Sequence, residues 1–147
     1  MYEDLKGKTA LITGAGKETG IGYAIARKLA ADGTDIIIAD LTEDTTDPLV
    51  TGDEDTMDRL AKELSDTYGV KAMAVGLDVT RTASIEQMID TVKDRFNRID
   101  ILCNNAGTVF GVPNAVHTYD EDAWMKTIDV NLHGVFRVSR AVVPLIP

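Results

Sequence analysis

The sequence has little of what would mark a secreted, metal-binding or membrane protein. Its 147 residues contain one cysteine, Cys103, which excludes an internal disulfide framework and a paired-cysteine metal motif. No apolar run approaches the roughly 18 residues of a membrane span, and the opening residues, with Glu3 and Asp4, lack the apolar core of a signal peptide. We therefore expect a cytoplasmic protein with no metal and no membrane partner.

Basic side chains are also scarce. The chain carries 15 Lys and Arg against 24 Asp and Glu, for a formal net charge of −9. A surplus of negative charge is repelled by phosphate backbones, which argues against a nucleic-acid partner. Four of the acidic side chains and no basic one fall in a predicted loop over 41–53, which is longer than most connections of its kind. We interpret this run as a solvated loop whose role the sequence does not define.

Apolar residues make up 44% of the chain and follow two patterns. Short apolar runs predict buried strands near residues 10–12, 35–40, 71–77 and 99–104, and apolar residues at helical spacing predict helices that begin near 21, 54, 84 and 118. Strands that alternate with helices form right-handed crossovers and a parallel sheet covered on both faces. The predicted fold is α/β, a Rossmann-type doubly wound parallel sheet, incomplete at about four strands, in one domain over 1–147.

Several helix boundaries have local signals. Gly69 is expected to end the second helix, and Ser84–Gln87 and Thr118–Glu121 have the spacing of capping boxes. The last helix is expected to continue from the second of these toward Pro144. We expect Trp124, Met125 and Phe136 to serve helix packing and Cys103 to lie in the core, while His117 and His133 have no second metal ligand at a suitable spacing.

A glycine cluster separates the first strand from the first helix, at Gly14, Gly16, Gly20 and Gly22. A strand that turns sharply into a helix directs unpaired N–H groups and the positive end of the helix dipole at one place, where a phosphate binds well. Two simple templates fail, because Thr19 stands where GxGxxG needs glycine and Glu18 stands where a P-loop needs Ser or Thr. Taken alone, the cluster is either a nucleotide site or a tight structural turn.

Other candidate ligands follow the remaining predicted strands. Asp40 ends the second strand, Asp78 follows the third, and Asn104–Gly107 follows the fourth. Because ligands of such sheets bind outside the carboxyl ends of the strands, these residues and the glycine cluster are expected at one rim.

With these positions assembled, the chain resembles the short-chain dehydrogenase/reductase family along its whole length. The motifs that carry the resemblance are Asn104-Asn105-Ala106-Gly107, Thr13-Gly14 with Gly20-Ile21-Gly22, Asp78-Val79, and Asn131-Leu132-His133-Gly134 after Trp124. The resemblance implies that Gly14, Gly20, Ile21 and Gly22 cradle a pyrophosphate, that Asp78 and Val79 border the adenine, and that Asn105, Ala106 and Gly107 back the ribose. It implies a catalytic role for Asn131, which would organise a water used in proton relay.

Asp40 and the following Leu41 bear on the choice of cofactor. A carboxylate at the end of the second strand accepts hydrogen bonds from both ribose hydroxyls and repels a 2′-phosphate, which favours NAD over NADP. Lys17 in the glycine loop is the counter-evidence, because a cation there could pair with that phosphate. NAD is therefore the expected cofactor, with NADP the less favoured one.

The sequence departs from the family pattern in two places. Five residues separate Gly14 from Gly20, so either the loop is extended or Gly16 takes the first glycine's place; the long spacing is similar to that of the enoyl-reductase branch. The catalytic Ser and the Tyr-xxx-Lys pair of the family would lie beyond Pro147, and we treat Tyr2 and Lys6, which have that spacing, as a coincidence. We expect the amino-terminal portion of a longer domain, unable by itself to catalyse the reaction.

The leading hypothesis is an NAD-dependent oxidoreductase that moves hydride between nicotinamide and a small alcohol or ketone. The alternatives are a non-catalytic dinucleotide-binding fragment or sensor, and an NADP-dependent enzyme of the enoyl-reductase type. The resemblance also implies a homo-oligomer that associates through the last helix.

Overall fold

The computed structural model describes residues 2–42 and 53–147. Within these ranges four parallel strands form one sheet in the order β3-β2-β1-β4. The strands are β1 (Thr9–Thr13), β2 (Asp35–Asp40), β3 (Ala72–Gly76) and β4 (Ile101–Cys103). The predicted α/β fold with a parallel sheet is confirmed.

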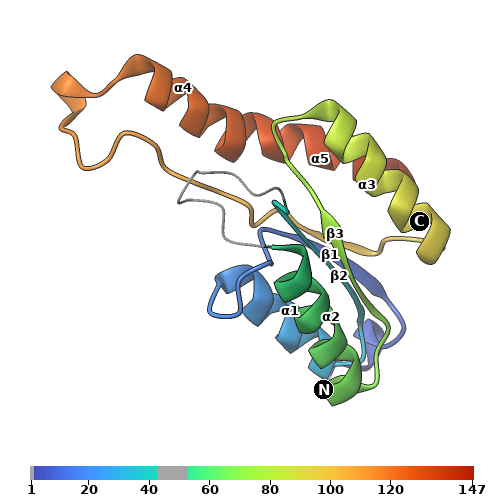
Figure 1. Ribbon diagram of the computed structural model, residues 1–147. Helices are drawn as coiled ribbons and strands as arrows, with labels where there is room; N and C mark the ends of the chain where they lie inside the picture. The colour runs from blue at the N-terminus through green and yellow to red at the C-terminus, as the bar shows by residue number, and fades with distance from the viewer. Residues whose placement is uncertain (1, 43–52) are drawn as a thin grey trace.

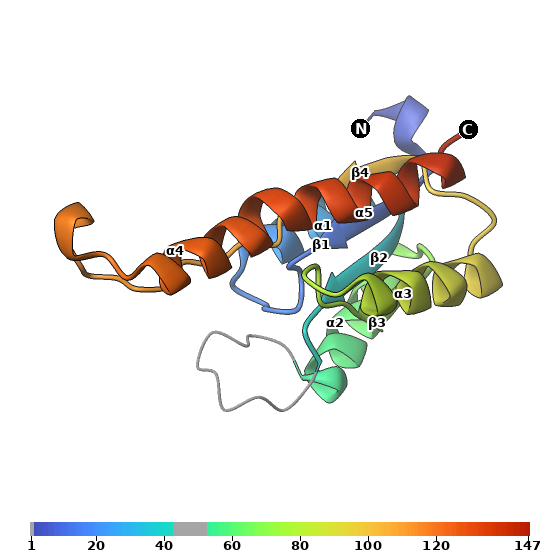
Figure 2. The same cartoon turned by 90° about the horizontal axis from the view of Figure 1, so that it is seen from above.

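Helices cover both faces of this sheet (Figure 1). One face carries α1 (Ile21–Ala31) and α2 (Glu54–Tyr68), and the other carries α3 (Thr82–Arg95) and α5 (Val135–Val142). Helix α4 (Glu121–Ile128) continues the line of α5 and projects beyond the sheet, as Figure 2 shows from above. The two are joined by a π-helical turn, Asp129–Gly134, and short 3-10 turns occur at Glu3–Leu5, Val116–Thr118 and Val143–Leu145.

The central strands divide the core into two layers. Leu11 and Ile37 pack toward α3 and α5, whereas Ile12 and Ile38 pack toward α1 and α2. All four side chains are fully buried, because successive residues of a strand point to opposite faces and both faces are covered. This explains why the strands appear in the sequence as unbroken apolar runs rather than as alternating ones.

The boundaries of α2 agree with their sequence signals. Its N-cap is Asp53, whose Oδ1 accepts a hydrogen bond from the N–H of Thr56 at 2.9 Å. Its C-cap is Gly69, which has the left-handed φ of 69° that glycine accepts without strain. The acidic loop expected over 41–53 falls mostly outside the described residues.

Both predicted capping boxes are wrong. Helix α3 begins after Arg81, and the hydroxyl of Ser84 accepts a hydrogen bond from the N–H of Asp78 at 2.9 Å. Helix α4 begins after Asp120, whose carboxylate accepts from the N–H of Ala123 at 2.8 Å, while Thr118 lies in the preceding 3-10 turn. At α3 the hydroxyl of Ser84 is already engaged by the N–H of Asp78. At α4 the carboxylate of Asp120 makes the capping hydrogen bond that the spacing assigns to Thr118.

The expectation that the large side chains of the last helix pack inside is also wrong. Trp124, Met125 and Phe136 are 54%, 53% and 62% exposed. Cys103 is half-buried on β4, the sheet's edge strand within the described residues, and burial raises the pKa of its thiol. None of the helices in these ranges is both long and apolar enough to cross a bilayer.

Candidate nucleotide site at the carboxyl ends of the strands

A crevice of about 310 Å³ opens where β1, β2 and β4 end. Nine of the predicted cofactor residues line it: Gly14, Ile21, Asp40, Leu41, Asp78, Val79, Asn105, Ala106 and Gly107. They come from four separate segments of the chain, and the parallel sheet brings them together because all its strands end at the same edge. Their roles in binding remain predictions.

Three other predicted cofactor residues lie beside the crevice rather than in its wall. Lys17 is an exposed loop residue. Gly20 is the N-cap of α1 and makes no side-chain cap, so the N–H groups of the first turn meet no capping side chain. Gly22 is buried, where a Cβ would stand 2.6 Å from Nδ2 of Asn105. Gly22 therefore serves the packing of α1 against the loop.

Gly14 lies where two chain segments approach each other most closely. Its φ is +68°, and a Cβ on it would stand 2.7 Å from Cα of Ala106. Both the backbone conformation and the lack of space demand glycine. The turn after β1 can therefore lie directly against the segment after β4.

The glycine loop is extended rather than shifted. Gly14 keeps the close approach to Ala106, whereas Gly16 lies against Asp40 and donates its N–H to Oδ2 at 2.8 Å. The added length emerges as the exposed residues 17–19. Glu18 in this stretch forms an ion pair with Arg59 of α2 at 3.0 Å, which connects the loop to the neighbouring helix.

Thr13 and Asn105 join the ends of β1 and β4. The hydroxyl oxygen of Thr13, which is buried, accepts from the N–H groups of Asn105 at 3.1 Å and Ala106 at 3.0 Å. The side-chain amide of Asn105 donates to the carbonyls of Thr13 at 3.0 Å and Gly14 at 2.9 Å. This reciprocal set holds the floor of the crevice in one geometry.

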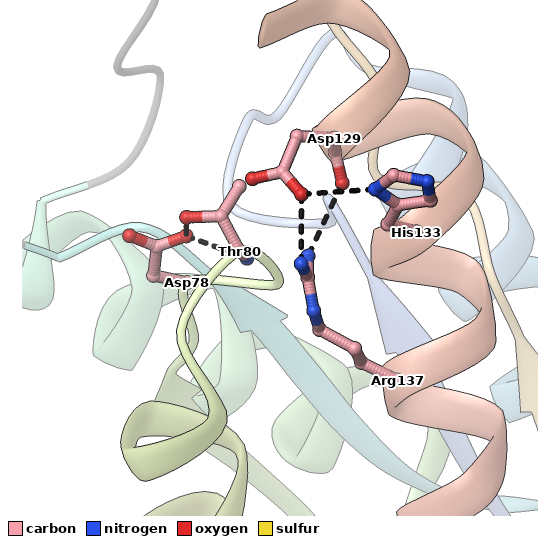
Figure 3. A network of polar contacts seen from close by, with 5 residues as sticks. All are labelled: Asp78, Thr80, Asp129, His133 and Arg137. Carbon is pink, nitrogen blue, oxygen red and sulfur yellow. Dashed lines mark hydrogen bonds and ion pairs between the residues drawn. The ribbon is translucent and has the colours of Figure 1, made fainter. Parts of the chain in front are cut away.

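The carboxylate of Asp78 closes the turn that follows β3. Oδ1 of Asp78 accepts from the N–H of Thr80 at 2.9 Å and from its hydroxyl at 2.6 Å (Figure 3). These bonds direct the carboxylate along the turn and leave Val79 to line the crevice. Asp78 therefore shapes the wall at the place where the resemblance expects adenine.

Asn131 lies in the π-helical turn and faces the segment that follows Gly107. Its Oδ1 accepts from the N–H of Thr108, and its Nδ2 donates to the carbonyl of the same residue, both at 2.8 Å. The side-chain amide thus both accepts from and donates to the main chain of one residue, Thr108. It does not itself line the crevice, although its neighbour Val130 does.

Five further wall residues were not among the predicted cofactor residues: Thr13, Ala39, Leu77, Thr108 and Val130. Ala39 and Leu77 directly precede Asp40 and the Asp78 turn, so the position of those acids could have indicated them. Thr108 directly follows the predicted residue Gly107, whereas Val130 had no such signal, because its place depends on how the π-helical turn packs. No cluster of three or more potential metal ligands occurs among the residues that the structure describes.

A parallel sheet with a glycine turn and an acid at one rim is the architecture of nucleotide-binding α/β proteins. The family model of the short chain dehydrogenases matches residues 8–147, and the chain belongs to that family. It is 37% identical over 143 residues to (−)-trans-carveol dehydrogenase of Rhodococcus erythropolis, an alignment that covers 95% of this chain and 50% of that protein. The chain spans about half the length of the curated relatives that it matches.

Two solved structures have the same fold. An alcohol dehydrogenase from the archaeon Thermococcus sibiricus, complexed with 5-hydroxy-NADP, superposes with a TM-score of 0.80 at 31% identity, over 95% of this chain and 53% of that one. A short chain dehydrogenase/reductase from Burkholderia phymatum, in complex with NAD, superposes with a TM-score of 0.79 at 29% identity, over 99% and 46%. Both kinds of nicotinamide dinucleotide thus occur among the similar structures.

Proposed function

We propose that this chain is the nucleotide-binding, amino-terminal portion of a longer NAD-dependent oxidoreductase domain. The whole protein would move hydride between nicotinamide and the carbon of a small alcohol or ketone. The observation that carries the proposal is the position of Asp40, which lines the same crevice as Asn105 and Gly14 of the glycine turn.

The crevice suits a dinucleotide diphosphate. Helix α1 begins beside it with a glycine N-cap and no capping side chain, so backbone N–H groups and the helix dipole are available to an anion. Gly14 lines the crevice as well, and its lack of a Cβ lets the segment after β4 close against it. Ile21, the first residue of that helix, supplies an apolar border.

The carboxylate of Asp40 supports NAD over NADP. Oδ2 accepts the N–H of Gly16 and Oδ1 accepts the N–H of Leu41, each at 2.8 Å. Because each carboxylate oxygen can accept two hydrogen bonds, one position on each oxygen is left for the two hydroxyls of a ribose. A 2′-phosphate would instead be repelled by the Asp40 carboxylate, which these two hydrogen bonds hold in position. Lys17 does not line the crevice, so its ammonium group is not part of the wall that a 2′-phosphate would contact.

Proton transfer would require groups that these residues do not include. The bound nicotinamide would supply the hydride chemistry, and the family's Ser and Tyr-xxx-Lys would be carried by the longer protein. Within this chain, Asn131 would contribute to the proton relay from the turn that it holds against Thr108. The chain alone is therefore proposed to bind the dinucleotide without turnover.

The test is a fluorescence titration of the chain with NADH and with NADPH. NADH should bind at least about tenfold more tightly, the scale of one charge-assisted hydrogen bond. Asp40→Asn should reduce this preference, whereas Asp66→Asn, an exposed carboxylate paired with Lys62 on α2, should leave it unchanged. Equal affinities in the wild-type chain would refute the role given to Asp40, and no binding of either would refute the proposal as a whole.

We also propose that the protein forms a homo-oligomer through α4 and α5. Trp124 of α4, Leu132 of the π-helical turn and Phe136 of α5 are 54%, 60% and 62% exposed, and large exposed apolar patches mark association surfaces. Sedimentation velocity should show an oligomer that Phe136→Asp dissociates. A wild-type chain that sediments as a monomer at every concentration would exclude this interface for the chain.

A further inference from the structure

The link between α4 and α5 is a complete π-helical turn rather than a continuation of the α-helix. Such turns are rare and occur often at functional sites. Here the wide turn directs three residues to different neighbours. Asn131 reaches Thr108, Val130 reaches the crevice, and Gly134 packs so closely on Val79 that a Cβ would stand 2.7 Å from its Cγ2.

Each residue of an α-helix advances by about 100°, so a change of register by one residue would turn Asn131 away from Thr108. It would also withdraw Val130 from the crevice wall. The stability of the π-helical turn relative to an ordinary α-helical one is therefore coupled to the shape of the crevice. Something must favour the wider turn, since it is intrinsically the less stable form.

Arg137 makes a contact that can favour the π-helical turn over an α-helical one. About two helical turns beyond Asp129, its guanidinium reaches back to the start of the π-helical turn (Figure 3). Nη2 donates to Oδ1 of Asp129 at 2.8 Å, and Nη1 donates to the main-chain carbonyl of the same residue at 3.4 Å. The side chain of Arg137 is 25% exposed, so the pair is partly shielded from water.

The other side chain that contacts this carboxylate is more exposed. Nδ1 of His133 lies 3.3 Å from Oδ1 of Asp129, and its side chain is 50% exposed. The hydrogen bond from Arg137, followed by that from His133, holds the pKa of Asp129 below its usual range against the opposing effect of burial. Arg140, three residues after Arg137, lies instead over the ring of Phe136, 5.3 Å from its centre.

We propose that Arg137 is a positioning residue for the nucleotide crevice. Its hydrogen bonds to the carboxylate and to the main-chain carbonyl of Asp129 maintain the π-helical turn. While the π-helical turn is maintained, Asn131 stays hydrogen-bonded to Thr108 and Val130 stays in the crevice wall. This inference rests on the proposed function, because it assigns Arg137 an effect on dinucleotide affinity at a site that it does not touch.

The experiment compares Arg137→Gln and Arg137→Lys with the control Arg140→Gln in the 147-residue chain. NADH affinity and hydrogen exchange at the amide of Thr108 are measured well below each variant's melting temperature. Arg137→Gln should weaken NADH binding and speed exchange at Thr108 by roughly tenfold each, the effect of losing a charge-assisted hydrogen bond. Arg137→Lys, which keeps the charge but not the two-point grip, should recover part of both, and Arg140→Gln should match the wild type.

The partner is tested with a double variant. If Arg137 acts through Asp129, then Asp129→Asn combined with Arg137→Gln should bind NADH no more weakly than Arg137→Gln alone. A lower melting temperature with unchanged NADH affinity and unchanged Thr108 exchange would show that Arg137 only stabilises the fold, and would overturn the inference. If the wild-type chain bound no NADH, the proposed function would fail, and the Thr108 exchange rates would still decide whether the grip holds the turn.

Discussion

The main-chain N–H of Gly16 donates a hydrogen bond to Oδ2 of Asp40 at 2.8 Å. A Cβ on Gly16 would stand 2.8 Å from Cβ of the same aspartate, so the loop and the end of β2 are fitted to one another. The residue that favours NAD in our proposal is therefore held in place by the glycine loop that is proposed to lie beside the diphosphate.

Gly16→Ala tests this connection. The added methyl group must displace the Asp40 carboxylate, and we expect NADH to bind roughly tenfold more weakly, as for the loss of a hydrogen bond to a charged group. Thr19→Ala, in the exposed part of the same loop, is the control and should bind as the wild type does. Equal affinities of Gly16→Ala and the wild-type chain would show that the position of Asp40 does not depend on Gly16.

A pair of glycine substitutions separates backbone strain from lack of space. Gly14 and Gly69 have nearly the same φ, 68° and 69°, but a Cβ meets Ala106 at the first position and nothing within 4 Å at the second. Gly69→Ala should lower the free energy of unfolding by about 1 kcal/mol from strain alone. Gly14→Ala should lower it by about 3 kcal/mol, since overpacking is added. Urea denaturation measures both, and equal losses would contradict the close approach.

Thr13→Val tests the join between β1 and β4. Valine keeps the shape of the side chain but leaves the N–H of Ala106 without its acceptor, whereas the N–H of Asn105 keeps the carbonyl of Cys103 at 3.0 Å. The free energy of unfolding should fall by about 1 kcal/mol, because one partly buried donor would lose its partner. In the control Thr91→Val, the lost hydroxyl only donates to Gln87 within α3, and the change should remain within about 0.5 kcal/mol.

Tyr23 predicts the response of the fold to alkaline pH. Burial, chiefly, raises the pKa of its phenol from 10.0 to about 12, and the hydroxyl donates to the carbonyl of Leu60 at 3.3 Å. The unfolded chain releases this proton near its ordinary pKa and the folded chain only near 12, so stability is lost as pH rises through this window. Below pH 10 the contribution of the raised pKa is fully present.

The comparison with Tyr23→Phe isolates this effect from other groups that titrate at high pH. Melting temperatures of the two chains are followed from pH 8 to pH 12. The wild-type chain should lose stability relative to Tyr23→Phe above pH 10, since phenylalanine has no proton to release. A difference that stays constant over the whole range would show that the phenol ionises as freely in the folded chain as in the unfolded one.

The sequence by itself determined the parts of this protein that depend on local pattern. Runs such as 35–40 are too short and too apolar for anything but buried strands, and the glycine cluster between 14 and 22 indicates a sharp turn from a strand into a helix. Parallel strands end at one edge, so Asp40, Asp78 and Asn105 could be expected to meet there before any coordinates were known. The family motifs follow from the same constraints.

Only the tertiary structure decided what depends on competition between distant groups. Ser84 does not cap α3, because its hydroxyl accepts the N–H of Asp78, and Val130 lines the crevice from the π-helical turn Asp129–Gly134. A π-helical turn has no sequence signature of its own, since its stability comes from contacts such as that of Arg137 with Asp129, eight residues or about two helical turns apart. Periodicity records which face a residue occupies in a regular helix, and it fails where the helix departs from regularity.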